Sequence, residues 1–162
     1  MVELEVLGVS QADENAYPLV LLRHESRVLP ILVGIPEASA IQVGIMGEKT
    51  ARPMTHDLMK NIFTGLRAEL KSVTIYRLEN DTFFAHLNME QYNAQGAVEQ
   101  VLRIDTRPSD GIAIAVRVGC PIFAADDVMD SAAQDASILG PGDGDDEDDD
   151  DDEDIFEEGD DA

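Results

Sequence analysis

The stretch Val101–Val118, which reads VLRIDTRPSDGIAIAVRV, joins a strand pattern to the start of a buried helix. Its first half alternates apolar with charged residues, as half-buried strands do. Pro108 then suits the first turn of a helix, because its φ is fixed and its missing N–H needs no partner there. Residues 112–116 carry no charge, so we expect this helix to be buried nearly all round.

Three polar residues mark the start of this helix: Arg107, Ser109 and Asp110. Charged groups avoid the protein interior unless they are paired or functional. We therefore treat this turn as a candidate site. Ser109 is better interpreted as a first-turn serine than as a nucleophile, because no general base is adjacent to it in sequence.

A similar strand and helix lie 73 residues earlier. Without gaps, Val28, Leu29, Ile31, Ala40, Ile41 and Val43 fall on Val101, Leu102, Ile104, Ala113, Ile114 and Val116, and Glu37 falls on Asp110. Chance similarity of two strand–helix units is one interpretation, and an internal duplication is the other. The duplication predicts that residues 28–45 and 101–118 superpose, with Glu37 and Asp110 at matching helix starts.

The rest of the chain alternates hairpins with helices. Strand patterns occupy residues 2–6, 17–23, 27–34, 73–79, 82–89 and 120–124, and helices are expected after Pro36, after Thr55 and from Asp126. In the helix after Thr55, one apolar stripe should face the core; it contains Leu58, Met59, Ile62, Phe63, Leu66 and Leu70. This order predicts an α+β fold with a mixed, largely antiparallel sheet packed on buried helices, and a β-β-β-α duplication within it.

Charge divides the chain into two parts. Residues 1–133 hold all eleven Lys and Arg against eighteen Asp and Glu, a net charge of −7, whereas residues 134–162 hold sixteen acids and no base. We therefore expect a domain at 1–133 and a disordered acidic tail at 134–162. The tail either keeps the protein soluble, or its acids and the Ile155–Phe156 pair occupy the domain's own anion site or recruit a basic partner.

The single cysteine, Cys120, excludes an internal disulfide and fits a reducing compartment. The N-terminus lacks the basic and apolar regions of a signal peptide, and no segment is long and apolar enough to span a membrane. A cytoplasmic protein without membrane contact is expected.

Glu37 and Asp110 each open a buried helix. If they converge, the two carboxylates could hold a divalent metal such as Mg²⁺ through oxygen ligands. The alternative is that each acid complements the dipole of its own helix.

A second polar cluster spans residues 52–57, and there His56 would stand in the first turn of its helix. A histidine can act as general acid or base near neutral pH, and a helix start favours an anion such as phosphate. Lys49, Arg52 and Arg107 could hold phosphates; the alternative is a surface histidine with ordinary ion pairs. Because charges near apolar helices need partners, this cluster should approach Arg107 and Asp110.

Three segments closely resemble the bifunctional nuclease domain family. They read GIPEA at 34–38, KTARPMTHDLM at 49–59 and IDTRPSDGIA at 104–113, and PIFA at 121–124 fits the same pattern. The resemblance covers residues 1–133. It implies a mixed α/β domain that is often dimeric, with nuclease activity on both DNA and RNA in some members.

Two functional hypotheses follow. The first is a phosphodiesterase acting on nucleic acid, with Glu37, His56, Asp57 and Asp110 as base or metal ligands and with Lys49, Arg52, Arg107 and Ser109 on the substrate. The second is a non-catalytic module that binds a small anion or a protein. The negative charge opposes the first, since nucleic-acid affinity comes largely from Lys and Arg. The enzyme is favoured if one open cleft is lined by Glu37, His56, Asp57, Arg107 and Asp110. The module is favoured if these residues pair off inside a subunit contact.

Overall fold

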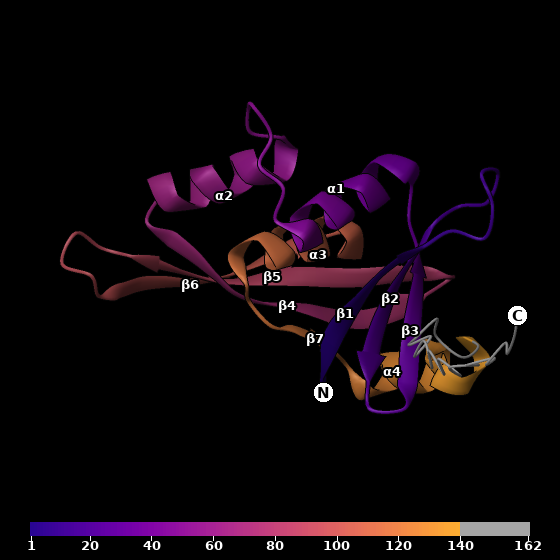
Figure 1. Cartoon of the computed structure of the whole chain (residues 1–162). Helices are drawn as coiled ribbons and strands as arrows, with labels where there is room; N and C mark the ends of the chain where they lie inside the picture. Colours follow the sequence, from indigo (N-terminus) through magenta and orange to yellow (C-terminus); the bar gives the residue numbers. More distant parts are fainter. Residues whose placement is uncertain (140–162) are drawn as a thin grey trace, which may run out of the picture.

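The computed structural model describes residues 1–139, which form eight strands, four α-helices and one 3-10 helix (Figure 1). The strands are β1 Val2–Ser10, β2 Leu19–His24, β3 Arg27–Leu32, β4 Ala68–Glu79, β5 Thr82–Tyr92, β6 Val98–Thr106, β7 Ile122–Ala124 and β8 Gln134–Asp135. The helices are α1 Ile35–Met46, α2 Thr55–Gly65, α3 Pro108–Val118 and α4 Asp126–Ala132, and the 3-10 helix is Ala136–Leu139. The predicted α+β class is confirmed.

All strands belong to one sheet with the order β6-β5-β4-β7-β1-β2-β3-β8. Neighbouring strands are antiparallel except β4 and β7, which are parallel. In Figure 1, β4 to β6 run across the view while β1 to β3 run down it, so the sheet is strongly twisted. The prediction of a mixed, largely antiparallel sheet is therefore confirmed.

The β-β-β-α order occurs twice. The meander β1–β2–β3 is followed by α1, the meander β4–β5–β6 is followed by α3, and the two meanders lie on opposite sides of β7. Glu37 is the third residue of α1 and Asp110 is the third residue of α3. The acids thus occupy matching helix positions, as the duplication predicts; superposition of the two backbones stays a prediction.

Helices α1, α2 and α3 lie together on one side of the sheet (Figure 1). Residues 112–115 of α3 are almost fully buried, which confirms the expected buried helix. Gly111 lets α3 sit directly on β4, because a Cβ there would lie 2.9 Å from a methyl group of Val73. Helix α1 is less buried, with Ile35 and Met46 exposed at its two ends.

The apolar stripe predicted for α2 is only partly buried. Met59 and Phe63 pack against the core, but Leu58, Ile62 and Leu66 are 52%, 47% and 57% exposed. Leu70, the sixth residue of that stripe, belongs to β4. The stripe is only partly buried because α2 packs mainly against α3 and β4, and only the side of the helix that faces them is covered.

The ordered backbone continues past residue 133, because Gln134 and Asp135 pair with Val28 and Arg27 of β3. Expectations about residues 140–162, including the acidic run Asp145–Asp154 and the Ile155–Phe156 pair, lie outside the described residues. Among residues 1–139, no helix has the length and apolarity that a membrane crossing requires.

Helices α1 and α3 approach closely at Gly44. A Cβ there would lie 2.6 Å from a methyl group of Val116 and 2.8 Å from Nη1 of Arg117. We predict that Gly44→Ala lowers the free energy of unfolding by about 1–3 kcal/mol, because the added methyl group overpacks the contact. This loss should exceed the gain of about 1 kcal/mol that alanine, a better helix former than glycine, contributes. Urea unfolding measures this change.

Gly65→Ala in α2 is the matched control, because no atom lies within 4 Å of its added Cβ. This substitution should stabilise the protein by about 0.5–1 kcal/mol. Equal effects of the two substitutions would contradict close packing of α1 on α3.

Candidate functional site

The N-termini of α1, α2 and α3 converge on one cleft of about 280 Å³. Its lining includes Glu37 from α1, His56 from α2, and Arg107 and Asp110 at the start of α3. Pro36, Ala40, Met54 and Thr55 complete the lining. Four of the residues predicted from sequence for catalysis or substrate binding thus share one open cleft, the geometry that favours the enzyme hypothesis.

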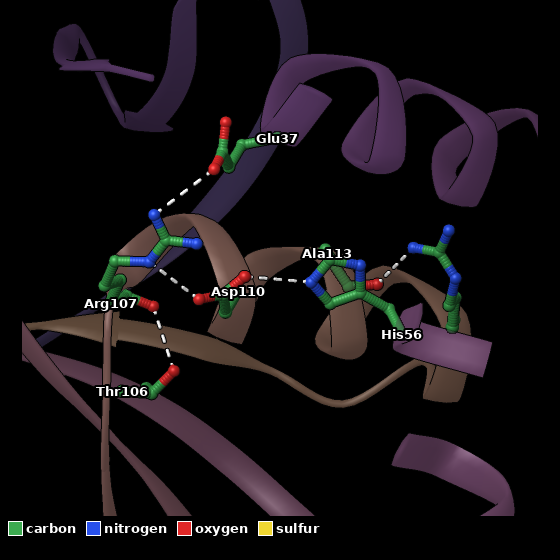
Figure 2. A network of polar contacts seen from close by, with 7 residues as sticks. Glu37, His56, Thr106, Arg107, Asp110 and Ala113 are labelled. Carbon is green, nitrogen blue, oxygen red and sulfur yellow. Dashed lines mark hydrogen bonds and ion pairs between the residues drawn. The ribbon is translucent and has the colours of Figure 1, made fainter. Parts of the chain in front are cut away.

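These four side chains form a continuous chain of polar contacts (Figure 2). Nε2 of His56 lies 2.9 Å from Oδ1 of Asp110. The other carboxylate oxygen of Asp110 accepts a hydrogen bond of 2.8 Å from Nε of Arg107. Nη1 of Arg107 donates in turn to Oε1 of Glu37 at 3.2 Å. The prediction that the two polar clusters approach each other is confirmed.

Asp110 stays ionised at neutral pH in this network. Burial acts to raise the pKa of its carboxyl group, but hydrogen bonds and charge from Arg107 and His56 outweigh burial and lower the pKa. In the tautomer of His56 that carries its proton on Nε2, this N–H donates to the ionised Asp110, and Nδ1 is left as a proton acceptor. Within residues 1–139, no group hydrogen bonds to Nδ1.

Arg107 stands between the two carboxylates and remains largely exposed. Its side chain is 64% exposed, and the hydrogen bond and charge of Asp110 raise its pKa. A guanidinium carries five N–H groups; among the described residues Asp110 and Glu37 each accept one, which leaves three for a ligand. Planar guanidinium donors match the oxygens of a phosphate.

Glu37 depends on a glycine for its position. The carboxylate of Glu37 occupies the space where a Cβ at position 34 would be, and a Cβ there would collide with Oε2 of Glu37. A glycine at position 34 therefore allows this side-chain position. Gly34 is the N-cap of α1 and has an ordinary negative φ, so the requirement is for space rather than for backbone freedom.

Asp57 does not line the cleft and holds the start of α2. One carboxylate oxygen accepts the backbone N–H of Met54 at 2.9 Å, and the other accepts Nε of Arg117 at 2.9 Å. The hydrogen bond from Met54 lowers the pKa of Asp57 most; burial opposes it, and Arg117 lowers it further. Among the predicted catalytic residues, Asp57 alone does not line the cleft.

Sequence reasoning missed Arg117. Its side chain is 6% exposed, Nη1 donates to the carbonyl of Ala113 at 2.6 Å, and Nη2 has no partner within residues 1–139. The available signal was a lone charge in the apolar run of α3, which requires a partner. The partner itself could not be identified, because Asp57 lies 60 residues earlier.

The remaining predicted substrate-binding residues lie outside this network. Lys49 and Arg52 are exposed in the loop between α1 and α2, and neither forms an ion pair with a described residue. Ser109 is buried at 8% exposure and lines a neighbouring cavity rather than the cleft.

The two acids considered as metal ligands do not fit that role in this arrangement. Arg107 links the carboxylates of Glu37 and Asp110, so a guanidinium stands where a shared cation would bind. In the described part of the chain, no group of three or more His, Cys, Asp or Glu side chains is arranged to hold a metal ion. Mg²⁺ bound by both acids would have to displace Arg107.

Comparison with known proteins gives one family match and three relatives. The family model of the bifunctional nuclease domain matches residues 19–137. Two uncharacterized proteins of Mycobacterium tuberculosis, from strains CDC 1551 and H37Rv, are 36% identical over 134 residues, covering 82% of this chain and 76% of each relative. Bifunctional nuclease 1 of Arabidopsis thaliana is 26% identical over 113 residues, which is 68% of this chain and 34% of that protein.

We predict that Asp110→Asn lowers the free energy of unfolding by about 1–3 kcal/mol at pH 7, because Arg107 and His56 lose an ionised partner. The folded pKa lies below the ordinary value of 3.8, so this contribution is fully present above that value and is lost as pH falls through the folded pKa. The difference between wild type and variant should therefore shrink below about pH 3.8 in urea unfolding at several pH values.

Asp130→Asn is the control, because Asp130 is 72% exposed in its ion pair with Arg27 and should contribute little at any pH. A difference for Asp110→Asn that is unchanged from pH 7 to pH 3 would contradict the ionised network.

Proposed function

Because the chain belongs to the bifunctional nuclease domain family, we propose that it is a nuclease that hydrolyses phosphodiester bonds of DNA and RNA. One observation carries the proposal: a His56–Asp110 pair of 2.9 Å and the guanidinium of Arg107 line the same open cleft. A proton acceptor beside a guanidinium that still has N–H groups for a phosphate is the minimum that hydrolysis of a phosphodiester needs.

In the proposed reaction, Arg107 binds the scissile phosphate through its free N–H groups. Nδ1 of His56 takes a proton from a water molecule as the water oxygen attacks phosphorus, and Asp110 holds the imidazole and balances its new charge. The bond from phosphorus to the leaving oxygen breaks, and that oxygen takes up a proton from solvent or from the imidazolium. Arg107 stabilises the negative charge that develops on the phosphate.

The other predicted residues support this geometry. Glu37 fixes the guanidinium of Arg107 from α1, and Asp57 with Arg117 fixes the first turn of α2, which carries His56. Both are positioning roles, since Glu37 lines the cleft but acts through Arg107, and Asp57 does not line the cleft.

Cations that form no ion pair with a described residue gather near α2, although the domain as a whole is negative. Six of the eleven Lys and Arg form ion pairs with described residues; the five that do not are Lys49, Arg52, Lys60, Arg67 and Arg103. Four of these five lie between residues 49 and 67, in α2 and in its flanking segments. Unpaired cations are the groups that release counterions when they neutralise nucleic-acid phosphates.

A non-catalytic anion-binding module is the second candidate. The observation that favours it is that Arg107 already has two carboxylate partners, as arginines in structural networks do. In such a module, Arg107 would still bind an anion, but His56 would transfer no proton.

We predict that the full chain degrades a labelled oligonucleotide and that His56→Gln and Asp110→Asn each lower the rate by at least about 100-fold, as loss of general-base catalysis does. Reactions with Mg²⁺ and with EDTA show whether a metal contributes. His24→Gln and Asp130→Asn are the matched controls, because His24 contacts the backbone of Glu3 and Asp130 pairs with Arg27. Controls that lose as much activity as the site variants would contradict the assignment, and binding without hydrolysis would favour the module.

We also propose that the protein is a homodimer in which a second copy covers an exposed stripe formed by Leu58 and Ile62 of α2 and by Leu66 at its C-cap. These side chains lie four residues apart along one line of the helix, so two copies related by a two-fold axis can pack stripe against stripe. Exposed apolar patches on soluble proteins mark such contacts.

Ile62→Lys is predicted to shift the protein from dimer to monomer in sedimentation measurements, because a charge would be buried in the contact. Val101→Lys is the control, since Val101 is an exposed apolar residue on β6, at 77% exposure. A dimer that survives Ile62→Lys, or a wild-type monomer, would contradict this interface.

A further inference from the structure

A second cavity, of about 410 Å³, adjoins the His56 cleft. The cleft and the cavity share two lining residues, Glu37 and Arg107. The ion pair between these side chains therefore forms a wall common to both. A phosphate bound to the exposed guanidinium of Arg107 would therefore have the His56–Asp110 pair on one side and this cavity on the other.

The lining of the cavity is largely apolar. Ile31 and Val33 from the end of β3 and Phe83 from the start of β5 supply its apolar surface, and Leu32 lies at 63% exposure beside them. Its volume falls within the range of about 300–1,000 Å³ that is common for small-molecule sites. An aromatic ring flanked by aliphatic side chains suits a flat, mostly apolar ligand group.

The charges of the lining determine which end of a nucleotide fits. Glu37 and Asp81 are acidic, and Arg107 at the shared wall is the only cation among the lining residues. Away from this wall the cavity repels further phosphates. Carboxylate oxygens and the hydroxyl groups of Thr82 and Ser109 offer acceptors for the amino and imino groups of a neutral base.

We propose that this cavity binds one unpaired nucleobase next to the scissile phosphate, so that the substrate is single-stranded nucleic acid or a nucleotide turned out of its helix. A base inside a duplex cannot enter a side pocket without unstacking, whereas single strands present their bases freely. The inference rests on the proposed nuclease function for the phosphate, and it assigns to Ser109 a place at the base rather than at the phosphate.

The test measures binding of two probes to the full chain by titration calorimetry: adenosine 5′-monophosphate, and ribose 5-phosphate, which lacks the base. The first should bind about tenfold tighter or more, the usual gain from stacking one base. Phe83→Ala should remove most of this difference. Because Phe83 packs against the core, the exposed Leu32→Ala provides a second variant and should reduce the difference as well.

Phe84→Ala is the matched control. Phe84 is the next residue of β5, the guanidinium of Arg77 lies 4.3 Å from its ring centroid, and it does not line the cavity. Equal affinities for the two probes, or a difference that Phe83→Ala and Leu32→Ala both leave intact, would overturn the proposal.

Hydrolysis assays separate this inference from the proposed function. Faster cleavage of a single strand than of the matching duplex supports the base pocket, and equal cleavage of both contradicts it while nuclease activity stands. No cleavage of either, with the preference for adenosine 5′-monophosphate intact, would support the pocket and contradict only the nuclease.

Discussion

The guanidinium of Arg107 connects two halves of the chain. It binds Asp110 in its own helix and Glu37 in α1, so the starts of α1 and α3 are held together by one side chain. Converging helix starts place partial positive charges close together, which is unfavourable without compensation. Each of the three helices carries an acid at its third residue, Glu37, Asp57 or Asp110, and this charge makes the convergence stable.

Packing around this network leaves little freedom. Glycines at 34 and 44 provide the space in which the side chain of Glu37 folds back and α1 approaches Arg117. Arg117 is buried, and its Nη2 has no partner among residues 1–139. Burying this polar group is unfavourable, and it occurs at the ion pair that positions α2. A cost of this kind is expected where geometry serves a site rather than stability.

Local patterns predicted the elements well. Pro108 and the uncharged run after it correctly predicted α3, and the alternation in β5 correctly predicted a half-buried strand. The same prediction is wrong for β6, which is an edge strand and mostly exposed, with Val101 at 77%. The approach of His56 to Asp110 also followed, because charges beside apolar helices need partners. Other features depend on which faces of the helices meet, which local sequence patterns do not show. They are the partly exposed stripe of α2, the Asp57–Arg117 pair, and the link that Arg107 makes between Glu37 and Asp110.

A crystal structure of the full chain with a phosphorothioate dinucleotide would show whether Arg107 organises a phosphate site between His56 and a base cavity. The account predicts a phosphorothioate oxygen within about 3 Å of the Arg107 guanidinium, close to Nδ1 of His56. One base should lie beside Phe83. A dinucleotide bound elsewhere, with the cleft and the cavity both unoccupied, would contradict the account.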